Sequence, residues 1–205
     1  MKKLVAMSLV AFSLFFVSCA SGYKEIMPDS QNYLSSEENS GVLLEYKYNV
    51  LKNKKYNKKE NKKGVKVASL KITNKSGRDL IFGKNLQLVN SKGVNLPLAT
   101  NKDVYNVLKQ KSGFYFFYLL LTPMQIGGSA NEYGEIEDGV PAGLVIGPGL
   151  ALGNFLMANS ANKKFNKELT DFDLYGRTIK NGETIYGLIG ISSDSHEKIG
   201  MKLVD

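Results

Sequence analysis

The stretch VASLKITNKSGRDLIFGKNLQLVNSKGVNLPL, residues 67–98, contains several short apolar segments separated by polar turns. The first segment, residues 65–73, begins two residues before this stretch. It places Ala68, Leu70 and Ile72 on one face, which is the period of a half-buried strand. Residues 74–77 and 90–93 are rich in the Asn, Ser and Gly that favour turns. Short strands separated by such turns predict an antiparallel β-sandwich, and therefore a mainly β fold.

The same pattern continues on both sides of this stretch. Apolar side chains alternate along residues 42–51, and strand-like sequence returns after residue 170. The strands that the sequence predicts are residues 42–51, 65–73, 80–82, 85–89, 94–98, 171–179, 184–191 and 198–204. Strands and helices do not alternate regularly, so a parallel sheet is not expected.

The quoted stretch and KNGETIYGLIGI, residues 180–191, resemble the two halves of immunoglobulin-like accessory domains in secreted bacterial proteins. The resemblance covers about residues 40–99 and 170–205. It implies an immunoglobulin-like antiparallel β-sandwich that serves as a binding or structural module. A fold by itself assigns no more specific function.

The first nineteen residues are organised like an export signal. A positive start, Met1-Lys2-Lys3, precedes an uncharged apolar run of fourteen residues, 4–17, and a segment of small residues that ends at Cys19. The run is shorter than the roughly 20 residues that a membrane-spanning helix needs. Residues 1–18 are therefore predicted to be a signal peptide.

The sequence Phe16-Val17-Ser18-Cys19 resembles the lipobox of bacterial lipoproteins, although the family usually has Leu at the place of Phe16. The resemblance implies that Cys19 carries a lipid and begins the mature chain. Because Ala20 rather than Asp follows Cys19, it also implies the outer membrane of a Gram-negative bacterium. The alternative is an ordinary or uncut signal with an incidental cysteine. Residues 19–40 are polar and are predicted to be a lipidated tether.

Residues 41–205 are predicted to form the β-sandwich domain, with a helical apolar insertion at about 101–169. Asp103 is expected to cap a short helix at the start of this insertion. An aromatic run at 114–121 is followed by residues 139–162, which contain no charged side chain. Pro148 with Gly149 is expected to divide this second segment, because an interior proline disfavours a helix in water by about 3 kcal/mol.

Three interpretations of this apolar hairpin remain open. It is part of the core, or it enters the membrane, or it presents a surface for a partner or for self-association. Helical spans are rare in outer membranes, which weakens the second interpretation. The residues expected to contact a membrane or partner are Phe114, Phe116, Phe117, Leu144, Leu152, Phe155 and Leu156.

The net charge of +8 comes from one segment. Residues 47–75 hold eleven lysines and a single acidic residue, Glu60, and residues 52–63 contain three copies of x-Asn-Lys-Lys. A solvated loop is expected here; a patch for anionic lipid headgroups, acidic polysaccharide or nucleic acid is the alternative. Nucleic-acid binding is not expected, because Tyr56 is the only aromatic residue in the repeat.

Motifs for catalysis or for a metal or other cofactor are not apparent in the sequence. The single histidine, His196, lies in a polar loop without the further nitrogen or sulfur ligands that a zinc site needs. We therefore expect a non-catalytic, lipid-anchored envelope protein that acts as a binding or scaffolding module. The alternative is a membrane-inserting or oligomerising protein that acts through residues 114–158. No small-molecule ligand can be assigned.

Overall fold

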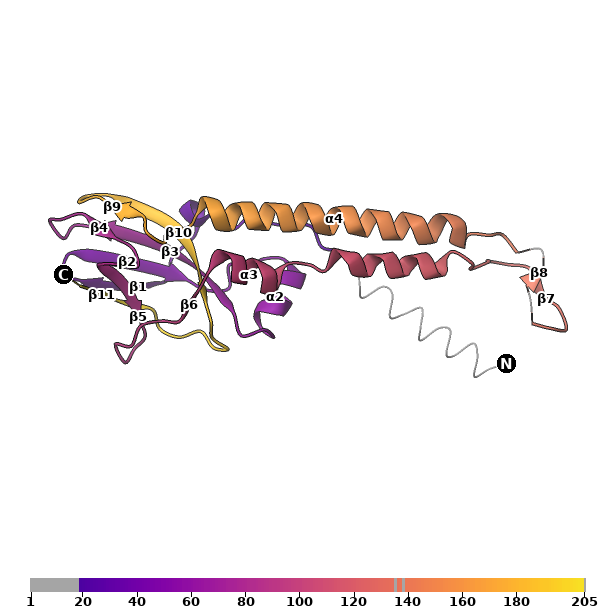
Figure 1. Ribbon diagram of the computed structural model, residues 1–205, viewed down its shortest axis with the longest axis horizontal. Coiled ribbons are helices and arrows are strands. Elements are labelled where there is room, and N and C mark those ends of the chain that lie inside the picture. Colours follow the sequence, from indigo (N-terminus) through magenta and orange to yellow (C-terminus); the bar gives the residue numbers. More distant parts are fainter. Residues whose placement is uncertain (1–18, 135, 138, 205) are drawn as a thin grey trace. The chain divides into compact units, whose positions relative to one another are not determined.

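The computed structural model describes residues 19–134, 136–137 and 139–204 (Figure 1). The predicted signal peptide, residues 1–18, lies outside the described residues. The chain divides into two compact units. We call Tyr23–Lys109 with Asn162–Asp205 the sheet unit, and Met1–Gly22 with Gln110–Ala161 the hairpin unit.

The sheet unit contains most of the secondary structure. Its elements are η1 (Pro28–Ser30), β1 (Ser35–Asn39), β2 (Val42–Lys47), α2 (Lys54–Glu60), β3 (Lys66–Asn74), β4 (Leu80–Ile81), β5 (Leu86–Val89), β6 (Leu98–Ala99), α3 (Asn101–Leu108), β9 (Thr178–Ile179), β10 (Thr184–Ile191) and β11 (Gly200–Leu203). The last helix, α4 (Gly143–Asp171), begins in the hairpin unit and ends in the sheet unit.

A five-stranded sheet with the order β1-β2-β3-β10-β6 is the framework of this unit, and all of its neighbours are antiparallel. Leu44 of β2 lies opposite Ile72 of β3, and both are fully buried. Lys71 points to the other face and pairs with Glu45 across the strands at 2.6 Å. The predicted strand is thus confirmed, with Ala68, Leu70 and Ile72 on its buried face, although residues 66–70 are buried on both faces. The strand predicted at 184–191 is confirmed as β10.

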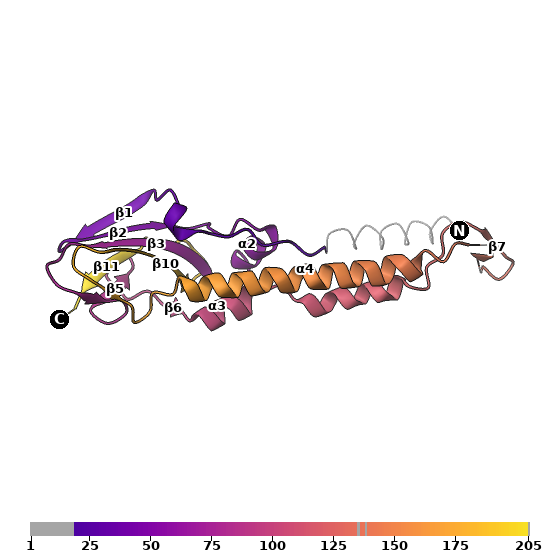
Figure 2. The same cartoon turned by 90° about the horizontal axis from the view of Figure 1, so that it is seen from above.

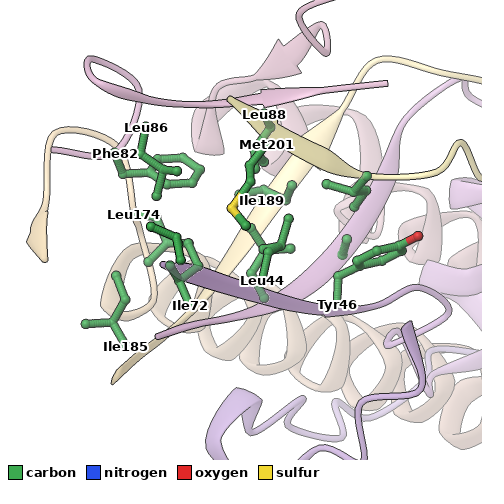
Figure 3. Close-up of a cluster of buried hydrophobic side chains, with 14 of the residues drawn as sticks. Leu44, Tyr46, Ile72, Phe82, Leu86, Leu88, Leu174, Ile185, Ile189 and Met201 are labelled. Atoms are coloured by element: carbon green, nitrogen blue, oxygen red, sulfur yellow. The ribbon is translucent and has the colours of Figure 1, made fainter. Parts of the chain in front are cut away.

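The core lies against one face of this sheet (Figure 3). The two-stranded ladders β4–β9 and β5–β11 supply Leu80, Leu86 and Met201 to the same cluster as Leu44 and Ile72. Two layers of antiparallel strands therefore share one hydrophobic core. Three predicted strands are much shorter in the structure. Residues 42–51 contain only β2, residues 94–98 contain only the first residue of β6, and residues 171–179 contain only β9.

The lysine-rich repeat, expected to be a solvated loop, contains the helix α2 instead. Its repeat length of four residues is close to the 3.6 residues of a helical turn, so the first position of each copy falls on one face. Tyr56 and Glu60 occupy that position and are fully buried. The Tyr56 ring packs on Phe165 of α4, with ring centroids 4.9 Å apart.

The short helix α3 forms where the sequence indicates one, but its cap differs from the prediction. Thr100, not Asp103, is the N-cap residue, and its side chain accepts a hydrogen bond from the Asp103 backbone N–H. Val104 is fully buried against β10. This contact depends on Gly190, since a Cβ there would lie 2.1 Å from Cγ2 of Val104.

The segment after Cys19, predicted to be a tether, is largely part of the fold. Ile26 is fully buried, and residues 35–39 form β1 at the edge of the sheet. Glu168 of α4 explains the docking: its Oε1 accepts hydrogen bonds from the backbone N–H of Ile26 at 2.7 Å and of Met27 at 2.9 Å. Its Oε2 accepts a hydrogen bond from the Tyr23 hydroxyl. The polar composition of residues 19–40 did not indicate these contacts, because the acceptor Glu168 lies more than 140 residues away in sequence.

The hairpin unit consists of η2 (Ser112–Leu121), the two-stranded ladder of β7 (Ser129–Ala130) and β8 (Ile136–Glu137), and the first part of α4. Figures 1 and 2 both show η2 alongside α4, with the β7–β8 ladder in the connection between the end of η2 and the start of α4. The expected division at Pro148 is wrong, because α4 runs through it. Pro148 lies early in α4, and its missing N–H would have bonded only to the carbonyl of Leu144.

The prediction of a mainly β fold needs correction. Helices account for 31% of the residues and strands for 27%, so the content is mixed. The difference comes from α4, which alone has 29 residues, and from α2, which replaces a predicted loop.

Candidate membrane-contact site

The candidate site is the hairpin unit, which includes the exposed Cys19. The two residues that follow Cys19, Ala20 and Ser21, form hydrogen bonds with the rest of this unit. The Ala20 N–H donates to Oδ1 of Asn154 at 2.5 Å. Ser21 and Gln110 exchange two hydrogen bonds, from Ser21 N to Gln110 Oε1 at 3.1 Å and from Gln110 Nε2 to Ser21 O at 2.6 Å. A lipid on Cys19 would therefore leave the protein directly beside the hairpin.

Small residues form the contact between the two helices. A Cβ on Gly143 would lie 2.2 Å from the carbonyl oxygen of Leu121, and one on Gly147 would lie 3.0 Å from that of Tyr118. Further along α4, Ala151 and Ala158 are buried in the same interface. This spacing of about four residues produces a smooth strip that lets two helical backbones approach closely.

Most of the larger apolar side chains point outward, away from the contact between η2 and α4. Tyr115 and Tyr118 are the large residues inside the hairpin, stacked with centroids 6.4 Å apart. Fifteen of the 21 large hydrophobic residues that are exposed in the described part of the chain lie between positions 114 and 157. They are Phe114, Phe116, Phe117, Leu119, Leu120, Ile126, Tyr133, Val140, Leu144, Val145, Ile146, Leu150, Leu152, Leu156 and Met157. Water-soluble domains have the opposite arrangement, with large apolar side chains inside.

These exposed side chains form a band of limited length. From Leu144 to Met157 the helix rises about 20 Å at 1.5 Å per residue. The band continues to Val140, which is bridged to Ile126 beyond the helix ends, and reaches about 25 to 30 Å in total. This matches the hydrocarbon thickness of a bilayer, about 25 Å in outer membranes and about 30 Å elsewhere.

The two ends of the band carry opposite charges. Exposed lysines, among them Lys111 and Lys163, stand at the end where the chain joins the sheet unit. The connection at the other end contains Glu132 and an aromatic residue, Tyr133, which is 90% exposed. Helix α4 is long and apolar enough to cross a membrane, and only 22% of its most apolar window is buried.

All seven residues predicted to contact a membrane or partner lie in this unit. Six are exposed: Phe114, Phe116, Phe117, Leu144, Leu152 and Leu156. Phe155 is half-buried, and its ring lies 5.0 Å from that of Phe116. The sequence reasoning missed Asn154 and Gln110. The amide of Asn154 inside the apolar run of residues 150–158 was an available signal, whereas Gln110 stands between two lysines and gave none. Nothing in the sequence indicated that Ala20 and Ser21 were their partners.

Other parts of the described chain provide little for chemistry. His196 is exposed and lies on the Tyr48 ring, 4.8 Å between centroids. Groups of three or more potential metal ligands are not found among the described residues. A cavity of about 300 Å³ in the sheet unit is lined largely by apolar side chains and by Asp173. Asp173 itself accepts a hydrogen bond from the Tyr175 N–H.

Comparisons with protein-family models, with curated proteins and with solved structures found no match for this chain.

Proposed function

We propose that this chain is a non-catalytic, lipid-anchored envelope protein whose hairpin unit is embedded in the membrane that holds the lipid of Cys19. The sheet unit, in this proposal an immunoglobulin-like β-sandwich, is a binding or scaffolding module kept at the membrane surface. The proposed location is the outer membrane of a Gram-negative bacterium, as the lipobox-like sequence and Ala20 imply.

The inverted packing of the hairpin carries the proposal. Tyrosines, glycines and alanines lie inside, while Leu144, Leu152 and Leu156 are each more than half exposed. Each exposed leucine would gain about 1 kcal/mol by transferring that surface from water to hydrocarbon. The other exposed apolar side chains of the band add to this gain, which favours a bilayer over water as the surrounding of the hairpin.

The backbone also suits a bilayer. Helices satisfy their own N–H and C=O groups, which is a requirement inside hydrocarbon. The amide of Asn154, which lies on the α4 part of the band, accepts from Ala20 N and donates to the carbonyl of Leu150 at 2.8 Å. A proline inside a helix, such as Pro148, is more common in membrane helices than in soluble ones.

The test is flotation of the chain from Ala20 onward, which lacks Cys19, with phosphatidylcholine vesicles at high salt. We expect the protein to float with the vesicles, because hydrocarbon contact is insensitive to salt. Leu152→Asp should lower the partition coefficient by about 100-fold, as a carboxylate in a membrane-embedded helix costs about 2.5 to 3.5 kcal/mol.

Leu34→Asp is the matched control, because Leu34 is 83% exposed but lies in the sheet unit. This variant should float like the unmodified chain. A chain that stays in solution as a monomer, or equal losses in the two variants, would contradict membrane embedding.

Self-association through the hairpin is the second candidate function. Gly149 and Gly153 lie on exposed turns of α4, and a Cβ at either position would meet open space. A second hairpin could approach closely there. Oligomers in detergent that disappear in a variant with Gly149→Ile and Gly153→Ile would favour this candidate.

A further inference from the structure

The three copies of x-Asn-Lys-Lys place lysines on one face of α2 and the turn that follows it. Lys54, Lys58 and Lys62 occupy the third position of each copy, four residues apart, and all three are exposed. Tyr56 and Glu60 point to the interior from the opposite face. Helical folding has therefore turned a repeat in sequence into a stripe of positive charge.

This stripe borders an open depression of about 760 Å³ in the sheet unit. The described residues that line it are Asn49, Leu51, Lys52, Lys54, Asn57, Lys58, Asn61 and Lys62. Four ammonium groups and three amides are thus available, with no carboxylate among them. In the described chain, no ion pair engages any of these four lysines. Such a surface attracts phosphate groups.

Helix α2 contacts every point at which the chain passes between the two units. The Tyr56 hydroxyl donates to Oδ1 of Asn162, the first residue after the hairpin, at 2.9 Å. Nζ of Lys59 donates to the carbonyl of Lys109, the last residue before the hairpin. At the N-terminal crossing, the Tyr23 ring packs edge-on against Tyr56 at 5.5 Å.

Covalent connection thus keeps α2 near the ends of the hairpin, whichever way the two units are oriented. If the hairpin is embedded in a bilayer, its ends lie at the level of the headgroups. The lysine stripe is then within reach of that surface, because lysine side chains extend their charge outward on long stems.

We propose that Lys54, Lys58 and Lys62, with Lys52, form a docking surface for the anionic phosphate headgroups of the bilayer that holds the hairpin. This inference rests on the proposed function and names a lipid partner for it. Each lysine near an anionic surface contributes about 1 kcal/mol, or about fivefold in binding.

The experiment compares flotation of the chain from Ala20 onward with two kinds of vesicle at moderate salt. One contains phosphatidylcholine alone, and the other contains about one-third phosphatidylglycerol. The hairpin contributes equally to both, so the ratio of the two partition coefficients isolates the headgroup interaction. Lys54→Gln, Lys58→Gln and Lys62→Gln together should lower that ratio by about 100-fold.

A second triple variant controls for the loss of three positive charges. Lys75, Lys84 and Lys180 are exposed in turns of the same unit. Lys75 and Lys180 flank Asn74, about 26 Å along β3 from Lys66, whose ammonium group contacts α2. Their replacement by Gln should leave the ratio nearly unchanged. Equal effects of the two triple variants would overturn the proposal, since net charge alone would then be responsible.

The remaining outcomes distinguish headgroup docking from membrane embedding and from binding of a soluble anion. Equal capture by both vesicles would overturn headgroup docking while leaving membrane embedding intact. Capture by the anionic vesicles alone, lost in the first triple variant, would support docking and contradict embedding. Inorganic phosphate should not reduce the ratio more than chloride at the same ionic strength; a specific reduction would indicate a site for a soluble anion instead.

Discussion

Single glycines decide how closely the hairpin helices approach. Gly143 faces the backbone at the end of η2 and just after it, where a Cβ would meet three backbone atoms within 2.7 Å. Backbone atoms cannot move aside as a flexible side chain can. Gly149, six residues later on the same helix, faces open space.

We therefore predict opposite effects of the same substitution at these two glycines. Gly143→Ala should destabilise the hairpin by about 1 to 3 kcal/mol, as overpacking does. Gly149→Ala should stabilise α4 by up to about 1 kcal/mol, because alanine favours helix. Thermal unfolding in detergent, followed by circular dichroism, measures both. A harmless Gly143→Ala would mean that η2 and α4 do not touch there.

Glu60 is a buried carboxyl group on α2. Its Oε1 accepts a hydrogen bond from Val67 N at 2.8 Å, while Oε2 has no hydrogen-bond partner within the described part of the chain. Burial raises the pKa of Glu60 above its ordinary value of 4.5. The folded protein therefore holds this proton more tightly than the unfolded chain does.

The sign of the resulting pH dependence follows from linkage. A raised carboxyl pKa favours folding most at low pH, and the advantage falls as pH rises from about 4.5 through the folded pKa. Glu60→Gln removes this titration. Urea unfolding from acid to neutral pH should show the free energy of unfolding of the unmodified chain falling relative to the variant. A constant difference would contradict the assigned burial.

At the scale of elements, one side chain joins the N-terminal segment to α4. Glu168 accepts from the backbone N–H of Ile26 and Met27 and from the Tyr23 hydroxyl. Burial, together with this carboxylate, raises the pKa of Tyr23 well above its usual range. The tyrosine therefore stays protonated and remains a donor at physiological pH.

Glu168→Ala should destabilise the sheet unit by about 3 kcal/mol, because one buried N–H group, one partly buried N–H group and a hydroxyl lose their acceptor. Asp171→Ala is the control, as it removes only the exposed pair with Lys167 and should cost less than about 1 kcal/mol. Urea unfolding in detergent compares the two. Equal losses would show that the segment after Cys19 is not anchored through Glu168.

The element α2 shows how packing can reverse a reading of the same residues. As a run of lysines and asparagines, residues 52–63 favour a solvated loop. Two residues of the repeat, Tyr56 and Glu60, have partners in α4 and β3 that only the folded chain brings near. Burial of these two stabilises a helix whose intrinsic propensity is modest.

At the scale of the whole molecule, the two units bury opposite kinds of side chain. The sheet unit buries its large apolar residues, such as Leu70, Ile72 and Phe82, and exposes charge. The hairpin unit buries glycine, alanine and tyrosine and exposes leucine and phenylalanine. The proposed function, with the sheet unit in water and the hairpin unit in hydrocarbon, accounts for both patterns. Leu152→Asp tests whether the hairpin unit faces hydrocarbon. Lys54→Gln, Lys58→Gln and Lys62→Gln together test whether the sheet unit meets the headgroups from the water side.

The sequence by itself determined the local features of this protein. The alternation around Leu70 and Ile72 predicted β3, because successive side chains of a strand point to opposite faces. The apolar run after Glu183 predicted β10. The apolar character of 114–121 and 139–162 was equally plain. The immunoglobulin-like topology and the lipid on Cys19 remain proposals.

Only the tertiary structure decided which way those features face. Composition showed that the hairpin was apolar but could not say that Gly143 and Gly147 lie inside while Leu144 and Leu152 lie outside. It could not pair Glu168 with Ile26 either, since the two are 142 residues apart. The physical reason is the same in both cases: burial is a property of the neighbours that folding brings into contact, and those neighbours are distant in sequence.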